Sequence, residues 1–311
     1  MRKTCLNMVY ELAKKDERII FIGSDLGAGT LDKFRKEIPE RFFMEGISEA
    51  NIIGIAAGLA MEGKIPYVNT IASFITRRCF EQVVLDICLH NVNVRLIGNG
   101  GGLVYAPLGP THEAIEDLAI MRAIPNMTVV APADANEMRK LMIQTAKYEG
   151  PIYIRLAKGY DPIVTTDDAQ FEIGKAILMR IGSDAIVITT GITLKNGLDA
   201  AAYLGEQGFD VAVLHVPTIK PLDSEAILKY IADIPIIVTI EEHSKIGGLG
   251  SAVAEIVAEE NFTHPKRFKR IGIPDVFPDE YGSQASLMKM YSISTENIIS
   301  VITKLTNDRS A

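Results

Sequence analysis

The chain has 311 residues, of which 48% are hydrophobic and 23% charged, and its formal net charge is −7. This balance argues against nucleic acid or an anionic membrane as the main partner. Three cysteines without metal-ligand spacing favour a reduced, cytoplasmic protein, and the longest apolar run, from Ile52 to Met61, is far too short to span a bilayer.

The first half of the chain alternates short β-rich runs with helical patterns, which predicts a parallel sheet covered by helices. The expected strands are 18–23, 42–45, 65–69, 92–98, 127–131 and 152–155. The expected helices are 6–15, 49–62, 78–90, 115–120 and 135–148. Turn-forming and charged residues between 157 and 168 then indicate a break between two domains.

A second unit of the same kind begins near Ile173. Its expected strands are 185–190, 211–216, 236–241 and 270–273, and its expected helices are 193–207, 224–231, 251–259 and 295–305. We therefore expect an α/β protein with two tandem doubly wound, mostly parallel-sheet, three-layer domains. The first covers 1–160, a linker 161–178 and the second 179–311, with ligands at the carboxyl ends of strands.

Glu49 is the most informative acidic residue of the chain. It opens a helix, Glu49 to Ala60, that is otherwise almost entirely apolar and small. A carboxylate in the first turn is stabilised by the helix dipole, so one interpretation is a capping acid. The other is a buried acid that exchanges a proton with a ring nitrogen of a ligand, its pKa tuned by the apolar surroundings.

Two further segments each have a structural and a functional interpretation. His112 lies at a turn-to-helix junction, where it is either a surface or capping histidine or an acid/base or hydroxyl-binding group. The run Gly247-Gly248-Leu249-Gly250 precedes a helix, and it either cradles a phosphate or forms a tight turn that permits close packing. Motifs alone therefore lead only to an α/β protein of undefined activity.

Taken together and in order along the chain, several segments resemble the C-terminal half of transketolases, from Arg2 to about Ile299. They are 46–51, 70–74 with 81–82, 109–119, 131–134, 218–223, and 241–244 with 247–252. Each segment is weak alone, whereas the ordered set at family-like spacing is specific. The resemblance implies a pyrimidine-binding domain at 1–160, a transketolase C-terminal-like domain at 179–311, and thiamine diphosphate as the cofactor.

The resemblance also implies roles for single residues. Glu49 matches the glutamate that hydrogen-bonds a pyrimidine nitrogen of the cofactor and stabilises its imino tautomer. Phe74 matches the aromatic residue that stacks on the aminopyrimidine ring, and Asp25 matches an acid that lies near the cofactor. His112 matches a histidine that faces the hydroxyls of the reacting ketose, so Glu49 and His112 are the expected catalytic residues.

Arg2 and Arg155 fall where the family places arginines that bind the substrate phosphate, a role that suits the bidentate guanidinium. Nearby, the chain departs from the family pattern. Gly100 and Leu108 replace a phosphate-binding histidine and an aspartate that contacts a sugar hydroxyl, and Gly29 replaces a phosphate-binding serine. We therefore expect a donor or acceptor sugar that differs from the usual pentose and hexose phosphates.

The sequence contains no Gly-Asp-Gly segment, on which thiamine enzymes hold magnesium and the diphosphate. We therefore expect no metal ligand in this chain and a partner, an N-terminal transketolase subunit, that binds magnesium and the diphosphate. The expected assembly is α2β2, with a homodimer of this chain inside it. The expected reaction transfers a two-carbon ketol unit from a ketose, expected to be phosphorylated, to an aldose.

Three alternatives remain open. The β subunit of a 2-oxo-acid dehydrogenase has the same two-domain plan, and a deoxyxylulose phosphate synthase-like enzyme is a closer relative. The segments 109–116 and 241–250 favour transketolase over the dehydrogenase. A non-catalytic binding or regulatory subunit would explain the loss of sugar-contacting residues before Gly109. The joint presence of Glu49, Phe74 and His112 argues against it, because a binding module has no need of the activating acid.

Overall fold

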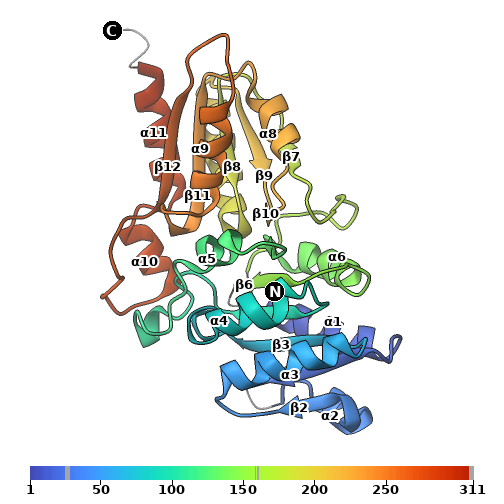
Figure 1. The fold of residues 1–311 in the computed structure, drawn as a ribbon. Helices are drawn as coiled ribbons and strands as arrows, with labels where there is room; N and C mark the ends of the chain where they lie inside the picture. The colour runs from blue at the N-terminus through green and yellow to red at the C-terminus, as the bar shows by residue number, and fades with distance from the viewer. Residues whose placement is uncertain (25–28, 158, 160, 308–311) are drawn as a thin grey trace.

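The computed structural model of the chain describes residues 1–24, 29–157, 159 and 161–307. Asp25 therefore lies outside the described residues. Two mostly parallel sheets with helices on their faces make up the described part, and Figure 1 shows the N-terminal sheet below the C-terminal one. The expected α/β class with two tandem domains is confirmed. In this part of the chain, no helix is long and apolar enough to cross a membrane.

Seven strands form the first sheet: β1 (Ile19–Gly23), β2 (Phe42–Met44), β3 (Ile65–Ile71), β4 (Arg95–Asn99), β5 (Thr128–Val130), β6 (Ile152–Leu156) and β10 (Thr218–Lys220). Their order is β10-β5-β6-β4-β3-β1-β2. All neighbours are parallel except β10, which runs antiparallel to β5. Strands such as β1 and β6 are buried along their whole length, as expected for a parallel sheet covered on both faces.

Helices cover both faces of the first sheet. On one face, α1 and α6 pack with β1 and β6 around Leu6, Phe21 and Leu141. On the other face, α3 and a segment with two π-helical stretches, η2 and η3, enclose Ile52, Val68 and Val83. The bounds are α1 (Arg2–Ala13), α2 (Asp32–Glu37), η1 (Pro39–Arg41), α3 (Glu49–Met61), η2 (Phe74–Arg78), α4 (Phe80–Gln82), η3 (Val83–Leu89), η4 (Ala106–Leu108), α5 (Asp117–Ala123) and α6 (Ala135–Thr145).

Five strands form the second sheet: β7 (Ile177–Arg180), β8 (Ala185–Thr189), β9 (Val211–His215), β11 (Ile236–Ser244) and β12 (Arg267–Ile273). Their order is β12-β11-β8-β9-β7, and only the β7–β9 pair is antiparallel among the described strands. The helical segments around this sheet are η5 (Gly191–Thr193), α7 (Leu194–Glu206), α8 (Ser224–Ile231), α9 (Leu249–Glu259), α10 (Gln284–Met290) and α11 (Thr295–Asn307).

The two expected domains interlock. One hydrophobic cluster joins Leu118 of α5 to Val253 of α9, and β10 lies in the first sheet although it comes from the second half of the chain. Across the same contact, His215 Nε2 lies 3.1 Å from a carboxylate oxygen of Glu137. Strand β7 begins at Ile177, inside the expected linker 161–178. The boundaries 1–160, 161–178 and 179–311 remain a proposal.

Candidate active site

Glu49 is the first residue of α3, which follows β2 at the edge of the first sheet. Its side chain is buried, with 5% of its surface exposed. At this position the helix dipole stabilises a negative charge. The guanidinium nitrogen Nη1 of Arg78 lies 3.4 Å from each of the two carboxylate oxygens. Glu49 is thus a buried carboxylate with a cation as its neighbour.

Phe74 begins the π-helical segment η2, three residues after the carboxyl end of β3. Short π-helical stretches occur frequently at functional sites. The imidazole of His112 approaches the Phe74 ring at a centroid distance of 5.1 Å and an interplanar angle of 61°. The guanidinium carbon of Arg78 lies 3.7 Å from the centroid of the same ring. Glu49, Phe74, Arg78 and His112 therefore form one cluster, which we call the ring-site cluster.

Arg77 and Ser73 hold the loop that carries His112. Arg77 Nη2 donates to the backbone oxygen of Glu113 at 2.8 Å and to the Glu116 carboxylate at 2.8 Å. The hydroxyl of Ser73 donates to the backbone oxygen of His112 at 3.2 Å. Because the anchors lie in or directly before η2, the segment that carries Phe74 also sets the position of His112.

A pocket of about 250 Å³ lies next to Tyr105, and Arg2, the first residue of α1, lies in its wall. Tyr105 joins the two regions, because its ring lies 6.4 Å from that of His112 and also lines the pocket. At Gly100, a Cβ would come within 2.2 Å of the Tyr105 ring. An aromatic ring and Leu108 thus lie where the resemblance expects a histidine and an aspartate.

These groups share one edge of the first sheet. Glu49 follows β2, Phe74 follows β3, Gly100 follows β4 and Ala157 follows β6. The carboxyl ends of parallel strands meet at the same edge, where open α/β sheets bind their ligands. The structure therefore brings Glu49, Phe74 and His112 together, with Arg2 beyond Tyr105.

Arg155 has a different environment from Arg2. Its Nε forms an ion pair of 2.9 Å with Asp117, and its Nη2 donates to the backbone oxygens of Ala114 and Glu242 at 3.2 and 2.8 Å. Burial alone lowers the pKa of Arg155, but the negative charges of Asp117 and Glu242 outweigh it and raise the pKa. The hydrogen bond to Glu242 joins the two domains. A role of Arg155 in binding a substrate phosphate stays a prediction.

The glycine run before α9 contacts a protein carboxylate. Glu241 accepts the backbone N–H groups of Leu249 and Gly250 at 2.7 and 2.8 Å, which fills the helix N-terminus. A Cβ at Gly248 would lie 2.0 Å from a Glu241 oxygen, so this close approach requires glycine. Of the two interpretations of this glycine run, these contacts favour the tight turn and not the phosphate cradle.

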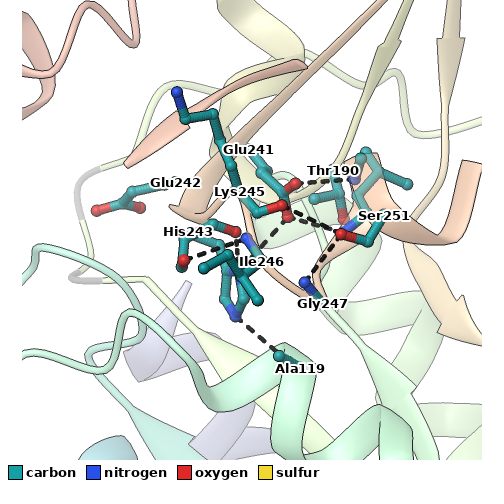
Figure 2. Close-up of polar contacts among 12 residues, drawn as sticks. Ala119, Thr190, Glu241, Glu242, His243, Lys245, Ile246, Gly247 and Ser251 are labelled. Carbon is teal, nitrogen blue, oxygen red and sulfur yellow. Dashed lines mark hydrogen bonds and ion pairs between the residues drawn. The ribbon is translucent and has the colours of Figure 1, made fainter. Parts of the chain in front are cut away.

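His243 lies beside Glu241 at the contact between the domains, and Figure 2 shows its ring pointing at Ala119. Its Nε2 accepts the backbone N–H of Ala119 at 3.3 Å, while Nδ1 lies 2.7 Å from the backbone oxygen of Ser244. His243 therefore contacts the backbone of both domains. We call Asp117, Arg155, Glu241 and His243 the interdomain cluster.

Two features of the site were missed from the sequence. The first is Arg78, and its signal is the spacing of four residues from Phe74, which places two side chains on one helix face. The second is a pair of buried acids, Glu113 and Glu242. Burial raises the pKa of each to about 7. Both carboxylate oxygens of Glu113 have no hydrogen-bond partner among the described residues.

The fold and the ring-site cluster define an α/β enzyme that can hold a planar, nitrogen-containing ring against a carboxylate and an aromatic face. Residues 1–160 match the family model of the transketolase pyrimidine binding domain, and residues 174–298 match that of the transketolase C-terminal domain. The chain therefore belongs to the transketolase family.

Several relatives are similar over nearly their whole length. The 6-deoxy-6-sulfo-D-fructose transketolase subunit of Clostridium sp. (strain MSTE9) is 37% identical over 96% of this chain and 92% of its own. One subunit of the apulose-4-phosphate transketolase of Phocaeicola vulgatus is 37% identical over 96% and 94%. A solved split gene transketolase, an inactive beta4 tetramer, superposes with a TM-score of 0.87 at 36% identity over 97% and 96%.

1-Deoxy-D-xylulose-5-phosphate synthases also match, but this chain spans less than half of their length. The expectation of a transketolase-like transferase of the split-subunit type is confirmed by these relatives. Membership of the family implies thiamine diphosphate as the cofactor. The ring-site cluster fits its aminopyrimidine, because a buried carboxylate accepts an N–H group and an aromatic face stacks on a planar ring.

Proposed function

We propose that this chain is the C-terminal subunit of a split transketolase and that the ring-site cluster binds the aminopyrimidine of its cofactor. The observation that carries the proposal is the convergence of Glu49, Phe74 and His112 from three separate segments onto one strand edge. Thiamine diphosphate, when bound, supplies the electron sink for cleavage of the carbon–carbon bond. The reaction moves a two-carbon ketol unit from a ketose to an aldose.

The protein groups have separate tasks in this proposal. Glu49 exchanges a proton with a pyrimidine nitrogen, and its buried position keeps water from competing for that contact. Phe74 stacks on the pyrimidine ring. His112 binds donor hydroxyls from its place beside Phe74, and Asp25 is proposed as the acid near the cofactor. For Arg155, the contacts with Asp117 and the backbone support a structural task instead.

The pocket at Arg2 supports a ketose donor with an anionic end group. Arg2 supplies a guanidinium that can bind a phosphate or sulfonate through paired hydrogen bonds. Leu108 and Tyr105 make the neighbouring wall largely apolar. The relatives named above act on a sulfonated and a phosphorylated sugar by their names. The same class of donor, rather than one particular sugar, is the proposal for this chain.

A partner subunit is the second half of the proposal. It carries the Gly-Asp-Gly segment, binds magnesium and the diphosphate, and joins a homodimer of this chain in an α2β2 assembly. Support comes from the two relatives named as transketolase subunits, which this chain covers almost completely. Three buried free cysteines support a cytoplasmic location.

Reconstitution tests the proposal. The chain is mixed with an N-terminal transketolase subunit, magnesium and thiamine diphosphate, and ketol transfer to glyceraldehyde 3-phosphate is followed by product chromatography. Transfer is expected only when both subunits are present, and it is expected to be faster from a phosphorylated or sulfonated ketose than from the uncharged sugar. Full turnover by this chain alone would contradict the split site.

A synthase-like reaction is the second candidate, since deoxyxylulose phosphate synthases match most of this chain. The discriminating assay is carbon dioxide release from pyruvate by the same reconstituted complex. Decarboxylation without ketol transfer would favour the synthase, whereas ketol transfer without decarboxylation would exclude it.

A further inference from the structure

The guanidinium of Arg78 contacts both halves of the ring-site cluster at once. Its carbon lies 3.7 Å from the centroid of the Phe74 ring, and its Nη1 lies 3.4 Å from both oxygens of Glu49. A guanidinium is planar, carries N–H donors and stacks on aromatic faces. In shape and in hydrogen bonding, Arg78 therefore makes the two contacts that a planar aminopyrimidine would make with Phe74 and Glu49.

The two contacts cannot be shared with a second ring on the same face of Phe74. Stacked groups are separated by van der Waals distance, and Arg78 already lies at that distance from the ring. A ring that stacks there and also reaches the Glu49 carboxylate needs the volume that the guanidinium fills. Such a ring must displace Arg78 before it binds.

The side chain of Arg78 is also free to move away from the ring-site cluster. Its side chain is 48% exposed, and the contacts described for it are those with Glu49 and Phe74. The neighbouring Arg77 differs, because it donates to the Glu116 carboxylate and to the backbone oxygens of Pro110 and Glu113. One of two adjacent arginines is thus anchored in the loop, whereas the other rests on the site with one side toward solvent.

We propose that Arg78 is a self-ligand of the pyrimidine site: it occupies the site in this chain and swings out when the cofactor ring enters. The proposal rests on the function proposed above for Glu49 and Phe74. The proposal predicts that substitution of Arg78 has two effects of opposite sign, one on pyrimidine binding and one on stability. Removal of the guanidinium opens the site to a pyrimidine, and at the same time it leaves the buried Glu49 carboxylate without its cation. Substitution of a residue with a purely structural task would instead weaken both pyrimidine binding and stability.

The test uses the full-length chain and 4-amino-5-hydroxymethyl-2-methylpyrimidine, the pyrimidine half of thiamine. Because the chain has no tryptophan, binding is measured by isothermal titration calorimetry rather than by tryptophan fluorescence. Arg78→Met keeps the length of the side chain and removes its charge and plane. We expect this variant to bind the probe about tenfold more tightly than the parent chain, while its midpoint of thermal unfolding falls.

Arg78→Lys keeps the charge and loses the plane, so its affinity for the probe is expected to lie between those of the parent and of Arg78→Met. It also serves as the second variant if Arg78→Met does not unfold cooperatively. Arg18→Met is the matched control, since Arg18 forms an exposed ion pair with Asp16 away from the site. Its affinity for the probe is expected to equal that of the parent chain.

Equal or weaker binding of the probe to Arg78→Met, including no measurable binding, overturns the self-ligand. The outcome is independent of turnover, since the probe cannot react. Tighter binding in a chain whose reconstituted complex shows no ketol transfer would keep Arg78 as a self-ligand and reject the proposed reaction. Ketol transfer without tighter binding of the probe to Arg78→Met would keep the proposed reaction and reject Arg78 as a self-ligand.

Discussion

The ring-site cluster and the interdomain cluster contain the same kinds of side chain, a carboxylate, an arginine and a histidine, in opposite conditions. In the interdomain cluster, each of these groups is buried and bonded to the backbone or to another buried side chain. In the ring-site cluster, the contacts are between side chains, and Arg78 is half exposed. The first arrangement holds two domains together, and the second leaves its groups available to a ligand.

This difference separates the family-like segments into two kinds. The segments at 46–51, 70–74 and 109–116 supply three members of the ring-site cluster, Glu49, Phe74 and His112. The anchor Ser73 belongs to the second of these segments. The segments at 241–244 and 247–252 supply close packing between β11, α9 and the first domain. Residue type alone does not distinguish the segments of the ring site from those of the domain contact. The partner to which each side chain is bonded does. Substitutions in the two clusters should therefore change different quantities.

Glu49→Gln should have the largest effect and should be confined to catalysis. Glutamine has the same size as glutamate but cannot exchange the proton, so the rate of ketol transfer by the reconstituted complex should fall by roughly 10²–10⁴-fold. The urea midpoint of the chain should hardly change. Glu62→Gln, at the exposed end of the same helix, is the control and should leave the rate unchanged. A comparable rate in Glu49→Gln would remove Glu49 from the mechanism.

Arg155→Met should act on stability. It leaves the buried Asp117 carboxylate without its cation, which costs about 3–5 kcal/mol in the free energy of unfolding. Urea denaturation measures the loss. The control is Arg180→Met, which breaks a partly exposed ion pair with Asp210 and a hydrogen bond to the backbone oxygen of Val211, and should cost about 1–2 kcal/mol. Unchanged stability with a raised KM for a phosphorylated donor would instead assign Arg155 to the substrate.

The contact between the domains should weaken as the pH rises. Burial raises the pKa of Glu113 and Glu242 to about 7, above the ordinary value of 4.5. Because the folded pKa lies above the unfolded one, the stabilisation is complete below the ordinary value and is lost as the pH rises through about 7. We expect a loss of roughly 1–3 kcal/mol between about pH 5 and pH 8.

Thermal unfolding across that pH range measures this loss. Glu242→Gln keeps an acceptor for the Leu103 N–H group and removes the titrating proton, so its unfolding temperature should depend less on pH. A pH dependence as steep as that of the parent chain would show that Glu242 is not the group responsible.

His243→Leu should have the smallest of these effects. It removes the acceptor for the Ala119 N–H group, a contact of 3.3 Å, and should cost about 1 kcal/mol in the free energy of unfolding. Ketol transfer at a temperature well below unfolding should be unchanged, because His243 lies in the interdomain cluster. A specific loss of the rate would extend the active site to His243 and break the distinction between the clusters.

The sequence predicts the buried strands well because a run such as 19–22 is apolar without interruption and is bounded by turn formers. It does not predict β10, where three residues between Pro217 and Pro221 have the pattern of a loop. The expected helix 78–90 is present, but most of it is π-helical, since α4 there lies between the π-helical segments η2 and η3. Local propensity does not distinguish these helix types.

The candidate site follows the same rule. Glu49, Phe74 and His112 could be named from their segments and their resemblance to a family. The stacking of Arg78 on Phe74 and the burial of Glu113 depend on which segments the fold brings together, and one sequence does not contain that information. The occupation of the α9 N-terminus by Glu241 is a further example. The residue types between 241 and 249 do not predict the conformation of the turn that brings this carboxylate to the helix.

Strand β10 has a consequence for how the molecule is made. Its pairing with β5 closes the edge of the first sheet, through Thr218 opposite Val130. As the chain leaves the ribosome, that edge remains unpaired until residue 220 has emerged, long after the other six strands of the sheet. A fragment cut at residue 160 would keep the edge open permanently and should be prone to aggregate, because an unpaired strand is a template for other chains. The first sheet, which carries the ring-site cluster, is therefore complete only when both halves of the chain are synthesised together.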